Sequence, residues 1–160
     1  MDPTTKNFID DDGRVRMFHG INSVVKGFPW YDPILLDQKR LDEIAEFGFN
    51  VVRLGTQWTG VEPEEGRINQ TYIDILVNIV EELEKRDIYV LMDMHQDVLW
   101  AAGELDDDGY WGVPPWIKHK LPKPDHYYPW PMKQVGSNWF CGYFSEEISK
   151  GFENIYKNYA

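Results

Sequence analysis

Three short polar clusters adjoin apolar runs of the sequence, and their side chains are of types that bind or activate substrates. Asn22 and Lys26 follow the first run, Arg53 lies inside the second, and His95-Gln96-Asp97 ends the third. A guanidinium is costly to bury unless a carboxylate or another hydrogen-bonding group accompanies it. Arg53 is therefore interpreted either as part of a polar site or as half of a structural ion pair at a strand end.

The role of His95 stays open between a base, a metal ligand and a hydrogen-bonding group, with a core histidine satisfied by main chain as the alternative. A metal is disfavoured, because a hydrolytic zinc site needs three protein ligands and no H-x-H or H-E-x-x-H pattern surrounds His95. Cys141 is the only cysteine, which excludes an intrachain disulfide and a Cys-based metal site. We therefore expect no metal and no cofactor. Asp97 faces the same side as His95 if the strand continues, and otherwise caps a loop.

These clusters must be positioned by the alternating elements that the sequence predicts. Apolar, β-branched runs predict strands at 18–22, 49–54 and 88–94, after a hairpin of 7–9 and 14–18 around Asp11-Asp12-Gly13. Helical spacing predicts helices from Asp37 to about Gly48, at 71–86, and from Ser145 to about Tyr159. Strictly alternating units favour a parallel sheet, which leaves a barrel and an open sheet as alternatives. In both, ligands bind at the carboxyl ends of the strands.

Two further segments lie between these elements. Residues 95–144 form a long irregular stretch that holds six of the ten prolines, and structureless loops of that length usually serve function. Glu62, Glu64 and Glu65 are interpreted as a solvated acidic loop before a helix.

Composition narrows the classes of partner. A net charge of -11 would repel nucleic acid and anionic membrane surfaces. Aromatic residues make up 15% of the chain, more than its core needs, and flat rings suit the C–H faces of sugars. The chain has no apolar run of membrane-spanning length and no signal-peptide pattern at its start. Asn69-Gln70-Thr71 fits the glycosylation sequon, which leans toward secretion.

Four sequence blocks, taken together and in this order, resemble the endoglycoceramidases of glycoside hydrolase family five. They are Phe18-His19-Gly20-Ile21-Asn22 with Lys26; Asn50-Val51-Val52-Arg53-Leu54 with Trp58-x-Gly60-Val61-Glu62-Pro63; Asp93-Met94-His95-Gln96-Asp97; and Gly136-x-Asn138-Trp139-Phe140. The resemblance covers nearly the whole chain. It departs from the family in the segment 106–116, which is longer and has Pro115 where a glutamate is usual.

The resemblance implies an α/β fold in which residues 1–160 are the first three or so units of a (β/α)8 TIM barrel catalytic domain. It also implies retaining cleavage of the glycan–ceramide linkage of glycosphingolipids by two glutamates. The family's Asn-Glu-Pro block does not occur here. Both glutamates are therefore expected after Ala160, and this chain alone is expected to be inactive. The alternatives are a cellulase-like or glucosylceramide-cleaving β-glucosidase, and a non-catalytic glycolipid-binding module.

The resemblance further implies roles for individual residues. Arg53 and His95 match residues that support the catalytic centre, and the positions that match substrate-binding residues are Lys26, Gln96, Asp97 and Trp139. The full-length protein is expected to be secreted, lysosomal or membrane-associated, with peripheral membrane contact. Its oligomeric state stays open.

Overall fold

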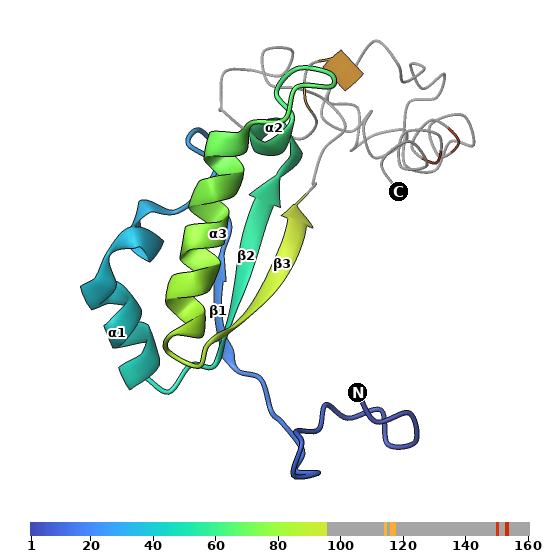
Figure 1. The fold of residues 1–160 in the computed structure, drawn as a ribbon, viewed down its shortest axis with the longest axis vertical. Helices are drawn as coiled ribbons and strands as arrows, with labels where there is room; N and C mark the ends of the chain where they lie inside the picture. The colour runs from blue at the N-terminus through green and yellow to red at the C-terminus, as the bar shows by residue number, and fades with distance from the viewer. Residues whose placement is uncertain (96–113, 115, 118–149, 151–152, 154–160) are drawn as a thin grey trace, which may run out of the picture.

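Three parallel strands form the centre of the described part of the molecule, which in this computed structural model comprises residues 1–95, 114, 116–117, 150 and 153. They are β1 (Gly20–Ser23), β2 (Val51–Gln57) and β3 (Tyr89–His95), and they lie side by side in the order β1-β2-β3 (Figure 1). The bounds of all three strands were predicted to within a few residues. Their parallel arrangement was also predicted. The predicted helix from Ser145 falls almost entirely outside the described residues.

The helices connect the strands as the sequence predicted. Helix α1 (Gln38–Glu46) joins β1 to β2, and α3 (Gln70–Glu84) joins β2 to β3. The side chain of Asp37 caps α1 by accepting a hydrogen bond of 2.9 Å from the main-chain N–H of Lys39. Gly48 follows α1 with a φ of 78°, a conformation that glycine adopts without strain.

Two short elements were not predicted, because a single turn leaves no periodic pattern to detect. They are the 3₁₀ helix η1 (Pro33–Leu36), which precedes α1, and α2 (Trp58–Val61), which directly follows β2. Asn69, the residue of the glycosylation sequon, caps α3 by accepting a hydrogen bond of 3.2 Å from the N–H of Tyr72.

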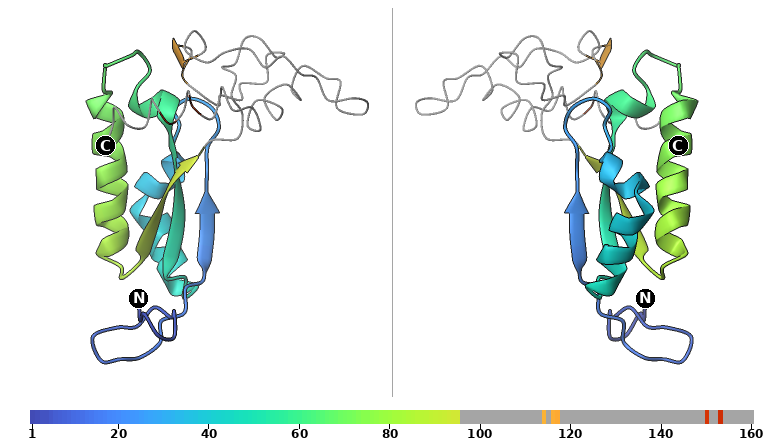
Figure 2. Two further views of the ribbon diagram at one scale, coloured as in Figure 1. Left: turned by 90° about the vertical axis from the view of Figure 1, so that its right-hand side faces the viewer. Right: turned by 90° about the vertical axis from the view of Figure 1, so that its left-hand side faces the viewer.

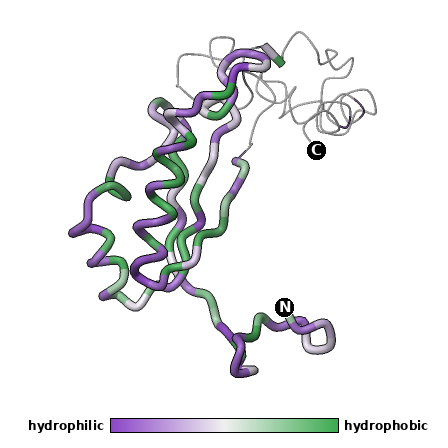
Figure 3. The backbone as a smooth tube through the Cα atoms, viewed as in Figure 1, coloured by the Kyte–Doolittle hydropathy of each residue, from purple (hydrophilic) through white to green (hydrophobic). Residues whose placement is uncertain are grey.

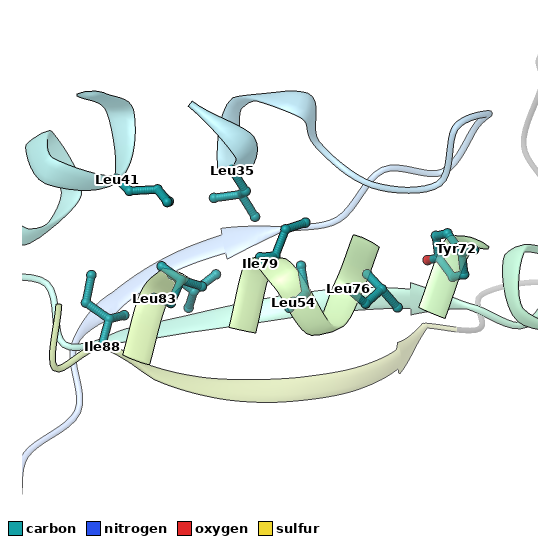
Figure 4. Packing of buried hydrophobic residues seen from close by; sticks show 9 residues of the cluster. Leu35, Leu41, Leu54, Tyr72, Leu76, Ile79, Leu83 and Ile88 are labelled. Atoms are coloured by element: carbon teal, nitrogen blue, oxygen red, sulfur yellow. The ribbon is translucent and has the colours of Figure 1, made fainter. Parts of the chain in front are cut away.

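The hydrophobic core lies between the sheet and the two longer helices, which cover the same face of it (Figure 2). Its buried members are Leu35, Leu41, Val52, Leu54, Tyr72, Leu76, Ile79, Leu83 and Ile88, most of which Figure 4 labels. Hydrophilic and hydrophobic stretches alternate along α1 and α3, as expected for helices with one face on a sheet (Figure 3). Side chains alternate along a strand, so Arg53, between the buried Val52 and Leu54, belongs to the opposite face.

The N-terminal hairpin is smaller than predicted. The structure reduces its two strands to one antiparallel bridge, between Ile9 and Val15. The hairpin lies at the end of the sheet where the strands begin, far from their carboxyl ends (Figure 1). Edge-to-face ring contacts link it to the sheet, with centroid distances of 5.2 Å from Phe8 to Phe18 and 5.3 Å from Phe18 to Tyr89. The polar clusters are therefore separate from this hairpin.

Candidate functional site

The strand register brings polar residues from all three strands together on the face of the sheet that the helices do not cover. Asn22 of β1 pairs with Arg53 of β2, and further along β2 the residues Gly55 and Gln57 pair with Asp93 and His95 of β3. Positions two apart on a strand share a face. The strands are parallel and point to the same edge of the sheet (Figure 1). The side chains of Asn22, Arg53, Asp93 and His95 therefore form one polar group on this face, near the carboxyl ends of the strands.

Arg53 is held by one residue from each neighbouring strand. Its Nη1 donates a hydrogen bond of 2.7 Å to Oδ1 of Asn22, and its Nη2 lies 2.6 Å from Oδ2 of Asp93. The prediction that this guanidinium needs a polar partner is confirmed. Arg53 was interpreted as part of a polar site or as half of a structural ion pair. These two interpretations do not exclude each other, because the ion pair with Asp93 is itself part of the polar group.

His95 joins the same group through Asp93. Nδ1 of His95 lies 2.9 Å from Oδ2 of Asp93, so one carboxylate oxygen contacts both the imidazole and the guanidinium. The side chains become less accessible along this series: Arg53 is 40% exposed, Asp93 20% and His95 13%. The group is thus open to solvent at Arg53 and largely enclosed at His95.

Asp93 was not among the site residues predicted from the sequence. Two signals pointed to it: the expectation that Arg53 requires a carboxylate, and its place two residues before His95, which puts it on the same face of the strand. Sequence alone did not choose among the acidic residues because the pairing depends on register.

The end of β2 is supported by a buried tyrosine. The Tyr72 hydroxyl donates a hydrogen bond of 2.9 Å to the main-chain oxygen of Trp30 and accepts one of 3.2 Å from the N–H of Gln57. Burial raises the pKa of Tyr72 above its ordinary value of 10.0. Gln57 is 1% exposed, and its side-chain Nε2 makes no hydrogen bond with the described residues. Tyr72 therefore ties α3 and the segment after β1 to the strand that carries Arg53.

Glu62 does not belong to a solvated loop, and that interpretation was wrong for this residue. It is 1% exposed; its Oε2 accepts a hydrogen bond of 3.1 Å from Nε1 of Trp58, and its Oε1 accepts one of 2.7 Å from the N–H of Gly66. Nε1 of Trp116 donates a hydrogen bond of 3.0 Å to the main-chain oxygen of Glu62. Glu64 and Glu65 are exposed, as predicted. The two donors to its carboxylate, Trp58 and Gly66, make the burial of Glu62 possible.

Of the remaining predicted site residues, the structure describes only Lys26. Lys26 is exposed in the segment after β1. Gln96, Asp97 and Trp139 lie outside the described residues. Within the described part of the chain, no cluster of three or more His, Cys, Asp or Glu could hold a metal ion. No helix described there is long and apolar enough to cross a membrane.

Comparison with known proteins identifies relatives of the chain. The family model described as cellulase (glycosyl hydrolase family 5) matches residues 3–122. An endoglycoceramidase of Cyanea nozakii is 34% identical over 173 residues, covering 99% of this chain and 34% of that protein. Endoglycoceramidase I of Rhodococcus hoagii (strain 103S) is 36% identical over 119 residues, covering 73% of this chain and 23% of that protein. The chain thus spans about a third, or less, of the length of these curated relatives.

Solved structures show a similar arrangement. The ganglioside GM3 complex of endo-glycoceramidase II from Rhodococcus sp. matches with a TM-score of 0.59 and 27% identity, over 96% of this chain and 34% of that one. A crystal structure of an endogalactoceramidase matches with a TM-score of 0.60 and 22% identity, over 94% of this chain and 34% of that one. The described strands and helices therefore correspond to the N-terminal units of the (β/α)8 barrel of these enzymes, as the sequence predicted.

Proposed function

The chain belongs to the cellulase family, glycosyl hydrolase family 5, and from this membership we propose that the full-length protein is a retaining glycosidase that cleaves the glycan–ceramide linkage of glycosphingolipids. The similarity to endoglycoceramidases over 99% of the chain supports this substrate class. In this proposal residues 1–160 are the N-terminal part of the catalytic barrel.

The observation that carries the proposal is the polar group of Asn22, Arg53, Asp93 and His95 on the uncovered face of β1-β2-β3. In a barrel that face points inward, and substrates bind at the carboxyl ends of the strands. Arg53 and His95 are held in place by short contacts with neighbouring protein side chains. Such preorganisation is what a transition state that develops charge requires.

The proposal assigns a role to each predicted site residue. The guanidinium of Arg53 supports the nucleophilic carboxylate by charge and by donated hydrogen bonds, and His95 contacts the sugar beside the scissile bond. Lys26, Gln96 and Asp97 bind glycan hydroxyls, and the ring of Trp139 packs against a sugar face.

The chemistry itself requires two glutamates, which we place after Ala160. One protonates the leaving oxygen while the other attacks the anomeric carbon, and in retaining enzymes their carboxyl groups lie about 5 to 5.5 Å apart. The covalent intermediate is then hydrolysed by water, with the first glutamate acting as base. This route needs no cofactor, and the isolated 160-residue chain should show no turnover.

Hydrolysis assays of the full-length protein test the substrate class. A ganglioside and cello-oligosaccharides are compared, and release of the intact glycan from the ganglioside, with little cleavage of cello-oligosaccharides, is expected. The reverse preference would favour the second candidate, a cellulase-like or glucosylceramide-cleaving β-glucosidase, which the description of the family model supports. Glycolipid binding without cleavage of either substrate would favour a non-catalytic binding module.

The location of the full-length protein is also a proposal. A glycosphingolipid substrate is embedded in a membrane, so we place the protein outside the cytosol or in lysosomes, in peripheral contact with a membrane surface. Fractionation of cells that express the full-length protein, with and without a high-salt wash, distinguishes peripheral association from a soluble state.

A further inference from the structure

Asp93 is in direct contact with the ring of its neighbour His95. Both residues lie on β3 two positions apart, so their side chains are on the same face of the sheet. The residue of β2 that pairs with Asp93 is Gly55, which has no side chain. The guanidinium of Arg53, two positions before Gly55 on the same face, contacts the Asp93 carboxylate at 2.6 Å.

The contact between Asp93 and His95 defines where the imidazole proton lies. An ionised carboxylate only accepts hydrogen bonds, so Nδ1 of His95, 2.9 Å from Oδ2, must be the donor. In the neutral imidazole this leaves Nε2 with the lone pair, as the accepting nitrogen. The neighbouring Arg53 is always charged and balances the negative charge of the Asp93 carboxylate. The contact between Asp93 and His95 therefore does not require a cationic imidazole.

We propose that Asp93 is a positioning residue that holds His95 in the Nδ1–H tautomer, so that Nε2 accepts a hydrogen bond from a substrate hydroxyl. This inference rests on the proposed function for the identity of the substrate, but the tautomer itself does not depend on it. Carboxylates that orient a functional histidine through its other ring nitrogen act in the same way at metal sites, where their loss lowers affinity or activity by about 10- to 100-fold.

A purely structural role for Asp93 makes a different prediction. If the carboxylate served only to tie β2 to β3 through Arg53, its removal would lower stability but would leave the tautomer of His95 unchanged. The tautomer is therefore the decisive readout, and it can be measured without any substrate.

The test uses the full-length protein labelled with ¹⁵N-histidine. Long-range ¹H–¹⁵N spectra distinguish a protonated from an unprotonated ring nitrogen, and the His95→Gln variant identifies the signals of His95. We expect a protonated Nδ1 and an unprotonated Nε2 in the wild type at a pH where the ring is neutral. A protonated Nε2 in the wild-type spectrum would overturn the proposal without the need for any variant.

Two variants complete the test. Asp93→Ala should shift His95 toward the Nε2–H tautomer and lower kcat/KM by about 10- to 100-fold. Asp42→Ala is the matched control, because Asp42 of α1 also pairs with an arginine, Arg86 at 2.7 Å in the turn after α3, away from the sheet face that carries Asp93. It should change neither readout. An unchanged tautomer in folded Asp93→Ala protein would overturn the proposal, whereas a protein inactive on gangliosides with the expected tautomer would overturn only the proposed function.

Discussion

The indole nitrogen of Trp58 donates a hydrogen bond of 3.1 Å to the carboxylate of Glu62, four residues later, and Glu62 is only 1% exposed. Trp58 is the first residue of α2, the short helix that follows the strand carrying Arg53, and Glu62 comes directly after this helix. The main-chain oxygen of Glu62 also binds Trp116, and the Trp58 and Trp116 rings meet edge to face at 5.7 Å. Glu62 therefore connects the end of β2 with a segment 54 residues away.

Replacing Glu62 by alanine should destabilise the full-length protein. The variant leaves the N–H groups of Trp58 and Gly66 without their acceptor; the first is buried and costs about 1–3 kcal/mol when unsatisfied, and the second is only part-buried and costs less. We expect a loss of roughly 2–4 kcal/mol in the free energy of unfolding on that basis, measured by urea denaturation. Glu64→Ala is the control: Glu64 is exposed and its ion pair with Arg67 lies on the surface, so its loss should stay below about 1 kcal/mol. Equal effects of the two substitutions would show that burial of Glu62 does not stabilise the fold.

Tyr72→Phe should lower stability while leaving the aromatic packing in place. The substitution removes the hydroxyl that satisfies the buried N–H of Gln57 and the oxygen of Trp30, with an expected cost of about 1–3 kcal/mol. Thermal unfolding at neutral pH measures this loss. Tyr31→Phe is a suitable control, because the Tyr31 ring lies near that of Tyr72 but is packed only at the margin of the core.

The same tyrosine should contribute to stability in a pH-dependent way. Burial raises the pKa of Tyr72 in the folded state above its ordinary value of 10.0. Because the folded state holds the proton more tightly, this contribution is complete below about pH 10 and is lost as the pH rises from there through the folded-state pKa. Wild-type protein should therefore lose more stability than Tyr72→Phe between pH 9 and pH 11, where unfolding curves are compared. Parallel losses would show that Tyr72 does not titrate differently on folding.

Arg53→Lys should reduce turnover strongly although it keeps the positive charge. A lysine has one compact ammonium group and cannot reproduce the planar fork that binds Asn22 and Asp93 at the same time. We expect kcat to fall by about 100-fold or more, in the range seen when one preorganised donor is removed from an active site. Arg40→Lys, on the exposed surface of α1, is the control and should keep full activity. Wild-type kcat in Arg53→Lys would contradict a role in catalysis.

Asp97→Ala should weaken binding of the glycan more than it slows the chemical step. Asp97 lies outside the described residues, and its role is inferred from the resemblance to endoglycoceramidases. We expect KM for a ganglioside to rise about tenfold or more, the equivalent of one charge-assisted hydrogen bond of about 1.5–3 kcal/mol, with kcat changed less. Steady-state kinetics of the full-length protein separate the two constants. Unchanged kinetics would show that Asp97 does not bind the glycan.

The order and type of the main elements could be predicted from the sequence because their signals are local. Asp37 and Gly48 delimit α1, and the spacing of Leu76, Ile79 and Leu83 marks the face of α3 that packs on the sheet. The apolar runs around Val52 and Val90 indicated strands, and the short connections between elements indicated a parallel sheet. The same logic placed polar residues at the carboxyl ends of the strands.

The partners within the site could not be predicted, since they depend on how distant strands align. Only the register sets Asn22 beside Arg53 and brings Asp93 within reach of its guanidinium, so that Arg53 and His95 share one carboxylate oxygen. The hydrogen bond from Trp116 to the main-chain oxygen of Glu62 likewise depends on the fold, because the two residues lie 54 positions apart in the chain. The sequence by itself determined which elements form and which residue types lie at their ends. Tertiary structure decided which residues of different elements meet, because hydrogen bonds and ion pairs act only over a few ångströms and separation along the chain does not fix that proximity.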